Sequence, residues 1–204
     1  MQFSTKKSIE DIQKQLSPKY DSVINQYCKN SGFKTRPHQI TLIVLKNEKL
    51  VELWFKDTTL IKKIKTYPIL AASGVQGPKL NEGDRQVPEG IYRIEYLNPN
   101  SLFYLSMKIN YPNSFDMAQA EVEGRTNLGN DIFLHGKESS VGCVAIGDEA
   151  IEELFYISSL IGKENIKVIM SPYDLRVKEL HTYSQSPWVN ELYQIIKLEM
   201  SNYH

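Results

Sequence analysis

Two short apolar segments joined by a polar turn constrain the fold of this chain most strongly. Residues 40–45 (Ile-Thr-Leu-Ile-Val-Leu) are mostly β-branched or apolar, Lys46–Lys49 is polar, and residues 50–55 (Leu-Val-Glu-Leu-Trp-Phe) are apolar and aromatic again. Runs of this length and composition on either side of a turn predict a pair of strands. A β-rich core is therefore expected from the first third of the chain onward.

Further strands are expected along the middle of the chain. Alternating or continuous apolar runs predict them at Ile61–Ala72, Ile91–Tyr96, Tyr104–Ile109, Asp131–Leu134 and Ile166–Met170. A glycine-rich loop, 73–78, follows the first of these runs.

Three segments have helical spacing instead. In residues 8–32 apolar side chains recur at steps of three and four, and Pro18 is expected to divide this helix in two. Asp148–Ile161 repeats in the same way, with Asp148 expected to cap its N-terminus. Pro187–Met200 carries one apolar stripe.

These elements predict an α+β fold, mostly β, in a single domain. We expect a helical extension at 1–35, a core at 36–175, and a second helical extension of the same domain at 176–204. A chain of 204 residues is long enough to bury such a core.

Composition excludes several classes of function. Lys+Arg and Asp+Glu both number 24, so the net charge is zero and the basic excess of a nucleic-acid-binding protein is missing. The chain contains no run of about 18 apolar residues, so no transmembrane segment is predicted. The N-terminus lacks the apolar segment and cleavage site of a secretion signal, which leaves a cytoplasmic protein, another export route or a removed leader as alternatives.

A histidine–glycine pair stands eight positions before a cysteine, and this segment indicates a chemistry. It reads His135-Gly136, then Ser140-Val141-Gly142-Cys143. A cysteine attacks carbonyl carbon as the thiolate, so a histidine within hydrogen-bonding reach can serve as its base. Gly142 gives a substrate carbonyl room to approach, and the N–H groups around Gly142 and Cys143 can form an oxyanion site. The carbonyl of Gly136 can orient the imidazole.

The alternative is a cysteine that is only a small buried hydrophobic residue. The chain has two cysteines, Cys28 and Cys143, which do not form a disulfide framework. His38, His181 and His204 form no ligand pattern with either cysteine, so no metal is expected.

Several motifs in order extend this interpretation. Residues 132–136 (Ile-Phe-Leu-His-Gly) with 140–143 (Ser-Val-Gly-Cys) resemble the signature of the L,D-transpeptidase (YkuD-type) catalytic domain. Residues 77–92, which begin Gly-Pro-Lys and end Pro-Glu-Gly-Ile-Tyr, and residues 110–116 (Asn-Tyr-Pro-Asn-Ser-Phe-Asp) resemble further segments of that family. The resemblance covers roughly residues 38–175 and is greatest to the YafK-like branch of murein L,D-transpeptidase proteins.

The resemblance implies a fold and an activity. It implies a mostly β sandwich or barrel, with Cys143 as nucleophile, His135 as general base, Gly136 as the group that orients it, and Ser140 as a hydroxyl beside the site. It implies peptidoglycan stem peptides as substrates, attacked beside diaminopimelate through an acyl-enzyme, and a place in the cell envelope. No cofactor is implied, and the oligomeric state is left open.

The chain departs from the common motif at three points. Val141 stands where the family usually has histidine, Ala145 where it has Arg or Asn, and the His135–Cys143 interval is short. The YafK-like branch shares these departures, which favour cleavage, of a stem peptide or of a protein–murein linkage, over cross-linking. Transpeptidation and a non-catalytic murein-binding module are the alternatives.

Charged residues in the loop after Gly77 are candidates for substrate binding. Lys79 and Arg85 suit the carboxylates of a muropeptide, and Glu82 or Asp84 suits its amine. Tyr111 is predicted to join them. The alternative is a solvated charged turn.

Overall fold

The computed structural model describes residues 6–179 and 186–204, so residues 1–5 of the predicted N-terminal extension and residues 180–185 of the C-terminal one, which include His181, lie outside the described residues. Its strands form one nine-stranded mixed sheet, in the order β3-β2-β1-β9-β5-β6-β7-β8-β4. The strands are β1 (Gln39–Leu45), β2 (Leu50–Lys56), β3 (Ile61–Pro68), β4 (Ala71–Ala72), β5 (Gly90–Ser101), β6 (Tyr104–Ile109), β7 (Phe133–His135), β8 (Val144–Ala145) and β9 (Ile166–Ser171).

The sheet curls so that its two edges come close together. β3 and β4 stand at opposite ends of the strand order, yet only Ile69 and Leu70 separate them in sequence. The N–H of Ile69 donates to the carbonyl of Lys49 at one edge, and the N–H of Leu70 donates to the carbonyl of Ala145 near the other. The predicted strand at 61–72 is therefore two strands, and the expected mostly β sandwich or barrel is confirmed.

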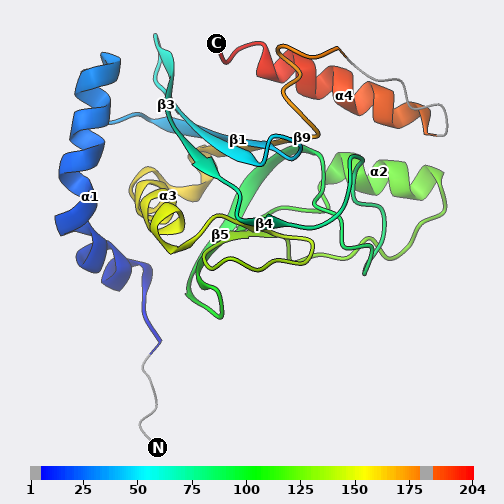
Figure 1. Ribbon diagram of the computed structural model, residues 1–204, viewed down its shortest axis with the longest axis horizontal. Coiled ribbons are helices and arrows are strands. Elements are labelled where there is room, and N and C mark those ends of the chain that lie inside the picture. The colour runs from blue at the N-terminus through cyan, green and yellow to red at the C-terminus, as the bar shows by residue number, and fades with distance from the viewer. Residues whose placement is uncertain (1–5, 180–185) are drawn as a thin grey trace, which may run out of the picture.

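The helices cover the sheet from both sides (Figure 1). They are α1 (Ile9–Ser31), α2 (Ser114–Val122), α3 (Asp148–Ile161) and α4 (Pro187–Met200), with a short 3-10 turn at Lys163–Asn165. The side chains of α1 and α3 share one core with alternate residues of β1, such as Leu42. The side chains of α4 pack on the opposite face, against Ile43 and Trp54. We call that second face the outer face of the sheet.

Two local predictions about the helices are wrong. Pro18 does not divide α1, which is continuous. The Lys14 carbonyl, which the missing proline N–H leaves without its usual partner, accepts a hydrogen bond from the hydroxyl of Ser17 at 3.4 Å. Asp148 is not the N-cap of α3. Gly147 takes that position with φ 82°, and the carboxylate of Asp148 binds Lys137 instead.

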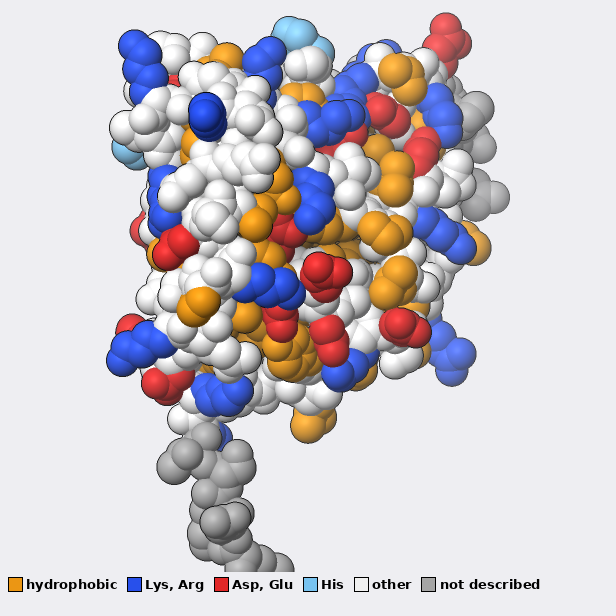
Figure 2. Space-filling view, turned by 60° about the vertical axis from the view of Figure 1, so that its left-hand side comes forward, with side chains coloured by type: hydrophobic (Ala, Val, Ile, Leu, Met, Phe, Trp, Pro, Cys, Tyr) orange, Lys and Arg blue, Asp and Glu red, His pale blue; other side chains and the backbone are white. Residues whose placement is uncertain are grey.

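The surface has no strong charge bias on the side seen in Figure 2, where basic and acidic side chains are interspersed. This agrees with the net charge of zero. Of the helices in residues 6–179 and 186–204, none has the length and apolar character needed to cross a bilayer.

Candidate active site

A parallel pair of very short strands brings the histidine and cysteine segments together. β7 and β8 pair in parallel, with Leu134 opposite Val144 and His135 opposite Ala145. Leu134 and Val144 point into the core, so His135 points to the other side because side chains alternate along a strand. Cys143 directly precedes β8 and lies beside the start of β7. Its Sγ is 3.4 Å from the backbone N of Phe133 and 3.5 Å from the carbonyl oxygen of Asp131.

The backbone fixes the orientation of the His135 ring. Its Nδ1 lies 2.6 Å from the carbonyl oxygen of Gly136, so Nδ1 carries the proton and donates it there. The lone pair is then on Nε2, which lies 3.4 Å from Oγ of Ser140. The ring of Phe103 packs at 4.5 Å between centroids.

Burial sets the charge state of this imidazole. His135 is 2% exposed, and its desolvation lowers its pKa below 6.5, although the bond to Gly136 acts in the opposite direction. The ring is consequently neutral near pH 7, with Nε2 unprotonated and able to accept a proton. This is the state that a general base requires.

Gly136 has no room for a side chain. A Cβ at this position would lie 2.6 Å from Oδ1 of Asp148 and 2.7 Å from the carbonyl oxygen of Phe103. Asp148 in turn accepts hydrogen bonds from the N–H of Lys137 at 2.9 Å and from its Nζ at 2.7 Å. The turn that carries Gly136, whose carbonyl binds the His135 ring, is therefore packed tightly between the start of α3 and the β5–β6 hairpin. We call this packing the clamp around His135.

The thiol of Cys143 is neutral at rest. Burial raises its pKa above 9.0, the Phe133 N–H lowers it, the charge of Asp131 raises it and that of Lys79 lowers it. The side chain is half-buried. A thiol and an imidazole that are both neutral suit proton transfer during attack rather than a permanent ion pair.

Ser73 joins the cysteine loop to the glycine-rich loop. Its Oγ accepts the N–H of Gly142 at 2.6 Å and donates to the carbonyl of Arg85 at 2.7 Å. Gly142 has φ 80°, a conformation that favours glycine. The Gly142 N–H is thus engaged, which leaves the N–H of Cys143 as the stronger candidate for the expected oxyanion site.

The loop predicted to bind substrate is organised around one ion pair. Nζ of Lys79 lies 2.6 Å from Oδ1 of Asp84, and Lys79 is 7% exposed. Burial would raise the pKa of Asp84, but the Lys79 hydrogen bond and three backbone N–H donors lower it. Asp84 accepts from the N–H groups of Leu80, Asn81 and Gln86.

The other predicted substrate-binding residues divide into buried and exposed. Tyr111 is 3% exposed, and its hydroxyl lies 3.3 Å from the carbonyl oxygens of both Lys79 and Leu128, so it supports the loop from beneath. Glu82 and Arg85 are exposed. Their side chains are open to a ligand, whereas Lys79 and Asp84 already pair with each other. Substrate binding by all five remains a prediction.

Sequence reasoning missed Ser73 and Phe103, which touch the Gly142 backbone and the His135 ring. Ser73 opens the glycine-rich loop that the sequence did reveal, so its position was visible but its partner was not. No local signal marked Phe103. Within the described ranges, no three His, Cys, Asp or Glu side chains gather as a metal site would require.

Comparison with known proteins identifies the family to which this chain belongs. The model of the L,D-transpeptidase catalytic domain, YkuD, matches residues 39–161, which include β1, His135, Cys143 and α3. The chain belongs to this family, as its motifs predicted.

Similarity to individual proteins supports this family assignment. The chain is 30% identical over 149 residues to an Escherichia coli (strain K12) protein named "Putative L,D-transpeptidase YafK", covering 69% of this chain and 58% of the relative. The crystal structure of the helical cell shape determining protein Pgp2 from Campylobacter jejuni superposes with a TM-score of 0.54 at 20% identity, over 78% of this chain and 52% of that one. This chain thus spans just over half the length of both proteins.

Proposed function

We propose that this chain is a cysteine acyl-transfer enzyme acting on the peptides of peptidoglycan, and that it hydrolyses an amide bond beside diaminopimelate. Family membership supports a peptidoglycan-related activity. The observation that carries the catalytic part is the state of His135, a buried neutral imidazole whose Nδ1–H is held by Gly136 and whose unprotonated Nε2 faces the hydroxyl of Ser140. An imidazole held in this tautomer is prepared to accept a thiol proton.

The reaction begins with a rotation of the thiol. At rest Sγ of Cys143 lies against the Asp131 carbonyl, and it turns toward Nε2 of His135 when substrate enters. Sulfur attacks the amide carbon while His135 takes the thiol proton. The Cys143 N–H stabilises the negative charge on the carbonyl oxygen. Collapse of this intermediate breaks the C–N bond, and the imidazolium gives its proton to the departing amine.

Hydrolysis completes the cycle. A water attacks the Cys143 thioester while His135 accepts one of its protons. The C–S bond breaks, the carboxylic acid leaves, and the proton returns to sulfur. Ser140, whose Oγ lies 3.4 Å from Nε2, is positioned to hold this water or relay its proton. The mechanism requires no cofactor.

The linkage cleaved is either a stem-peptide bond or the bond of a murein-linked protein, which places the enzyme in the cell envelope. The second candidate is transfer to an amine, because the E. coli relative bears the name of an L,D-transpeptidase. Glu82 and Arg85 are proposed to contact the amine and carboxylates of diaminopimelate, with Lys79, Asp84 and Tyr111 shaping the loop.

Incubation with purified muropeptides and with protein-bearing sacculi tests the proposal. Wild type and Cys28→Ala should release the same products, and Cys143→Ala should release none. Equal products from wild type and Cys143→Ala would overturn the catalytic claim. A free D-amino acid in the same reaction separates the two candidates, since its incorporation as the main product would show transfer instead of hydrolysis.

A further inference from the structure

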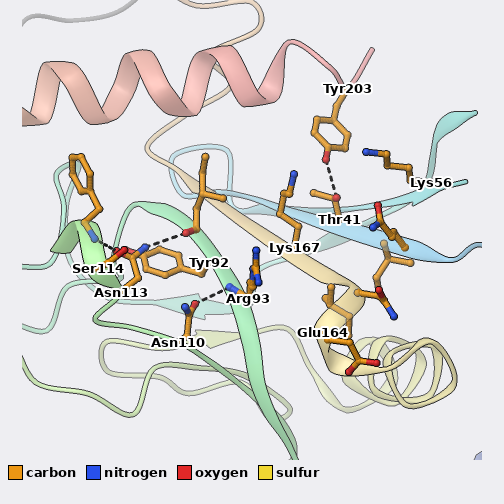
Figure 3. Close-up of a pocket in the computed structure, with 16 residues that line it drawn as sticks. Thr41, Lys56, Tyr92, Arg93, Asn110, Asn113, Ser114, Glu164, Lys167 and Tyr203 are labelled. Carbon is orange, nitrogen blue, oxygen red and sulfur yellow. Dashed lines mark hydrogen bonds between the residues drawn. The ribbon is translucent and has the colours of Figure 1, made fainter. Parts of the chain in front are cut away.

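A row of polar side chains crosses the outer face of the sheet, away from Cys143. Thr41 on β1 is opposite Lys167 on β9, and Lys167 is opposite Arg93 on β5. Asn110, just after β6, continues the row, since its Oδ1 accepts the Arg93 N–H at 2.7 Å. These residues form the floor of a cavity of about 680 Å³ (Figure 3). We call it the outer-face cavity; its lining includes neither His135 nor Cys143.

The C-terminal segment and the start of α2 wall this cavity. The hydroxyl of Tyr203 lies 2.9 Å from Oγ1 of Thr41, on the side where α4 passes above the sheet (Figure 3). Asn113 and Ser114 at the start of α2 line the other side, and Lys56 projects from the end of β2. A volume of this size is in the range of small-molecule sites, roughly 300–1,000 Å³.

The cavity carries unbalanced positive charge. Its lining contains three cations, Lys56, Arg93 and Lys167, and one acid, Glu164. Lys167 and Arg93 are direct cross-strand neighbours, an arrangement of like charges that destabilises a sheet. Glu199 of α4 pairs with Lys167 at 2.5 Å. In the part of the chain that the structure describes, Arg93 and Lys56 form no ion pair, unlike Lys167. An anion bound in the cavity would offset the part of this repulsion that Glu199 leaves.

Residues on the outer face of the sheet connect the cavity to the neighbourhood of Cys143, the candidate nucleophile. Lys108 stands two residues before Asn110 on β6 and is opposite Phe133. Its Nζ lies 3.1 Å from Oδ1 of Asp131, whose carbonyl contacts Cys143. From strand spacing and rise, Arg93 lies roughly 15 Å from Cys143. An extended peptide of about five residues spans that distance.

We propose that the outer-face cavity binds carboxylates of a peptidoglycan stem peptide that lies apart from the reacting bond, and so anchors the polymer while Cys143 acts. This inference rests on the proposed function. Stem peptides carry several free carboxylates, and the planar guanidinium of Arg93 matches a carboxylate in two-point geometry. Lys56 and Lys167 add charge, and Thr41 and Asn110 add hydrogen-bonding groups.

Binding by a catalytically inactive protein tests the cavity separately from the reaction. All proteins carry Cys143→Ala, and their affinity for a soluble muropeptide and for purified sacculi is measured by calorimetry and co-sedimentation. Arg93→Gln with Lys56→Gln removes two cations that form no ion pair, so the Lys167–Glu199 contact stays intact. Lys34→Gln with Lys62→Gln is the control, because it removes the same charge from exposed positions outside the cavity.

The cavity variant should bind at least about tenfold more weakly than the control, as expected for the loss of charge-assisted hydrogen bonds. A muropeptide with amidated carboxylates should bind the Cys143→Ala protein weakly. Its affinity should match that of the cavity variant for the unmodified muropeptide. Equal affinities of cavity variant and control would overturn the inference while leaving the proposed function intact. Inorganic phosphate that displaces the muropeptide at micromolar concentration would also overturn it, in favour of a phosphate site.

Discussion

Replacing Gly136 with alanine tests the tight packing around the imidazole of His135, the proposed general base. The new Cβ would lie 2.7 Å from the Phe103 carbonyl oxygen and 3.2 Å from Cγ2 of Ile151. The carbonyl oxygen belongs to the backbone of a hairpin and cannot rotate away, so Gly136 itself must move by about half an ångström to restore an ordinary contact. Its carbonyl, which holds Nδ1 of His135 at 2.6 Å, moves with it.

The expected consequence is a larger loss of activity than of stability. Overpacking of this kind costs about 1–3 kcal/mol of unfolding free energy. A displaced base can lower kcat/KM by about ten- to a hundredfold. Turnover of a muropeptide and denaturant unfolding would be measured on the same preparations.

Gly124→Ala is the matched control for this experiment. It introduces the same methyl group at φ 67°, with nothing within 4 Å, so it should lower stability through backbone strain and leave turnover near wild type. A Gly136→Ala protein that retains activity within twofold of wild type would refute the clamp.

Three further predictions follow from the described contacts. Because burial lowers the pKa of His135 and its protonated form cannot accept a proton, the fall of kcat/KM in acid should have its midpoint below pH 6.5, and a midpoint above 6.5 would contradict this assignment. Ser73→Ala leaves the Gly142 N–H without its partner at a cost of about 1–3 kcal/mol and should lower kcat/KM about tenfold, whereas unchanged kinetics would show that Ser73 does not position the cysteine loop. Burial raises the pKa of Asp116 from 3.8 to about 6, so the folded state holds this proton more tightly than the unfolded state, and the contribution of Asp116 to stability should decline as pH rises from about 4 to 6. Urea unfolding at a series of pH values should show no such decline for Asp116→Asn, and the same decline in the variant would contradict the raised pKa of Asp116.

Elements with a strong local pattern are predicted well. The first two strands and α3 follow from apolar periodicity, which depends on neighbours a few residues apart. The strand expected at 61–72 is interrupted, because the crossing at Ile69 and Leu70 is decided by contacts with Lys49 and Ala145. Sequence pattern alone does not contain those pairings.

The helix α2 was missed although its signal is local. Asn113 caps it by accepting from the N–H groups of Phe115 and Asp116, and the Asp116 carboxylate accepts the Asn113 N–H in return. That reciprocal pattern of an Asx residue followed three positions later by an acid can be recognised in a sequence. Residues 110–116 were interpreted only as a family motif.

The candidate site also contains a part that the sequence predicts and a part that it does not. Residues 135–143 are close in sequence, so the spacing of histidine and cysteine is enough to indicate a common site. The partners that hold it come from elsewhere: Ser73 lies 69 positions before Gly142, and Phe103 belongs to another strand pair. Long-range contacts of this kind depend on how the sheet curls, and a single sequence gives no spacing rule for them.

Intact-mass spectrometry of the quenched reaction tests the central claim most directly. Wild type mixed with a muropeptide and quenched in acid within the first turnovers should carry one acyl group, mapped to Cys143 by digestion and removed by hydroxylamine. Cys143→Ala should carry none and release no product. Release of product by Cys143→Ala at the wild-type rate, with no adduct on either protein, would contradict the proposal that Cys143 is the nucleophile.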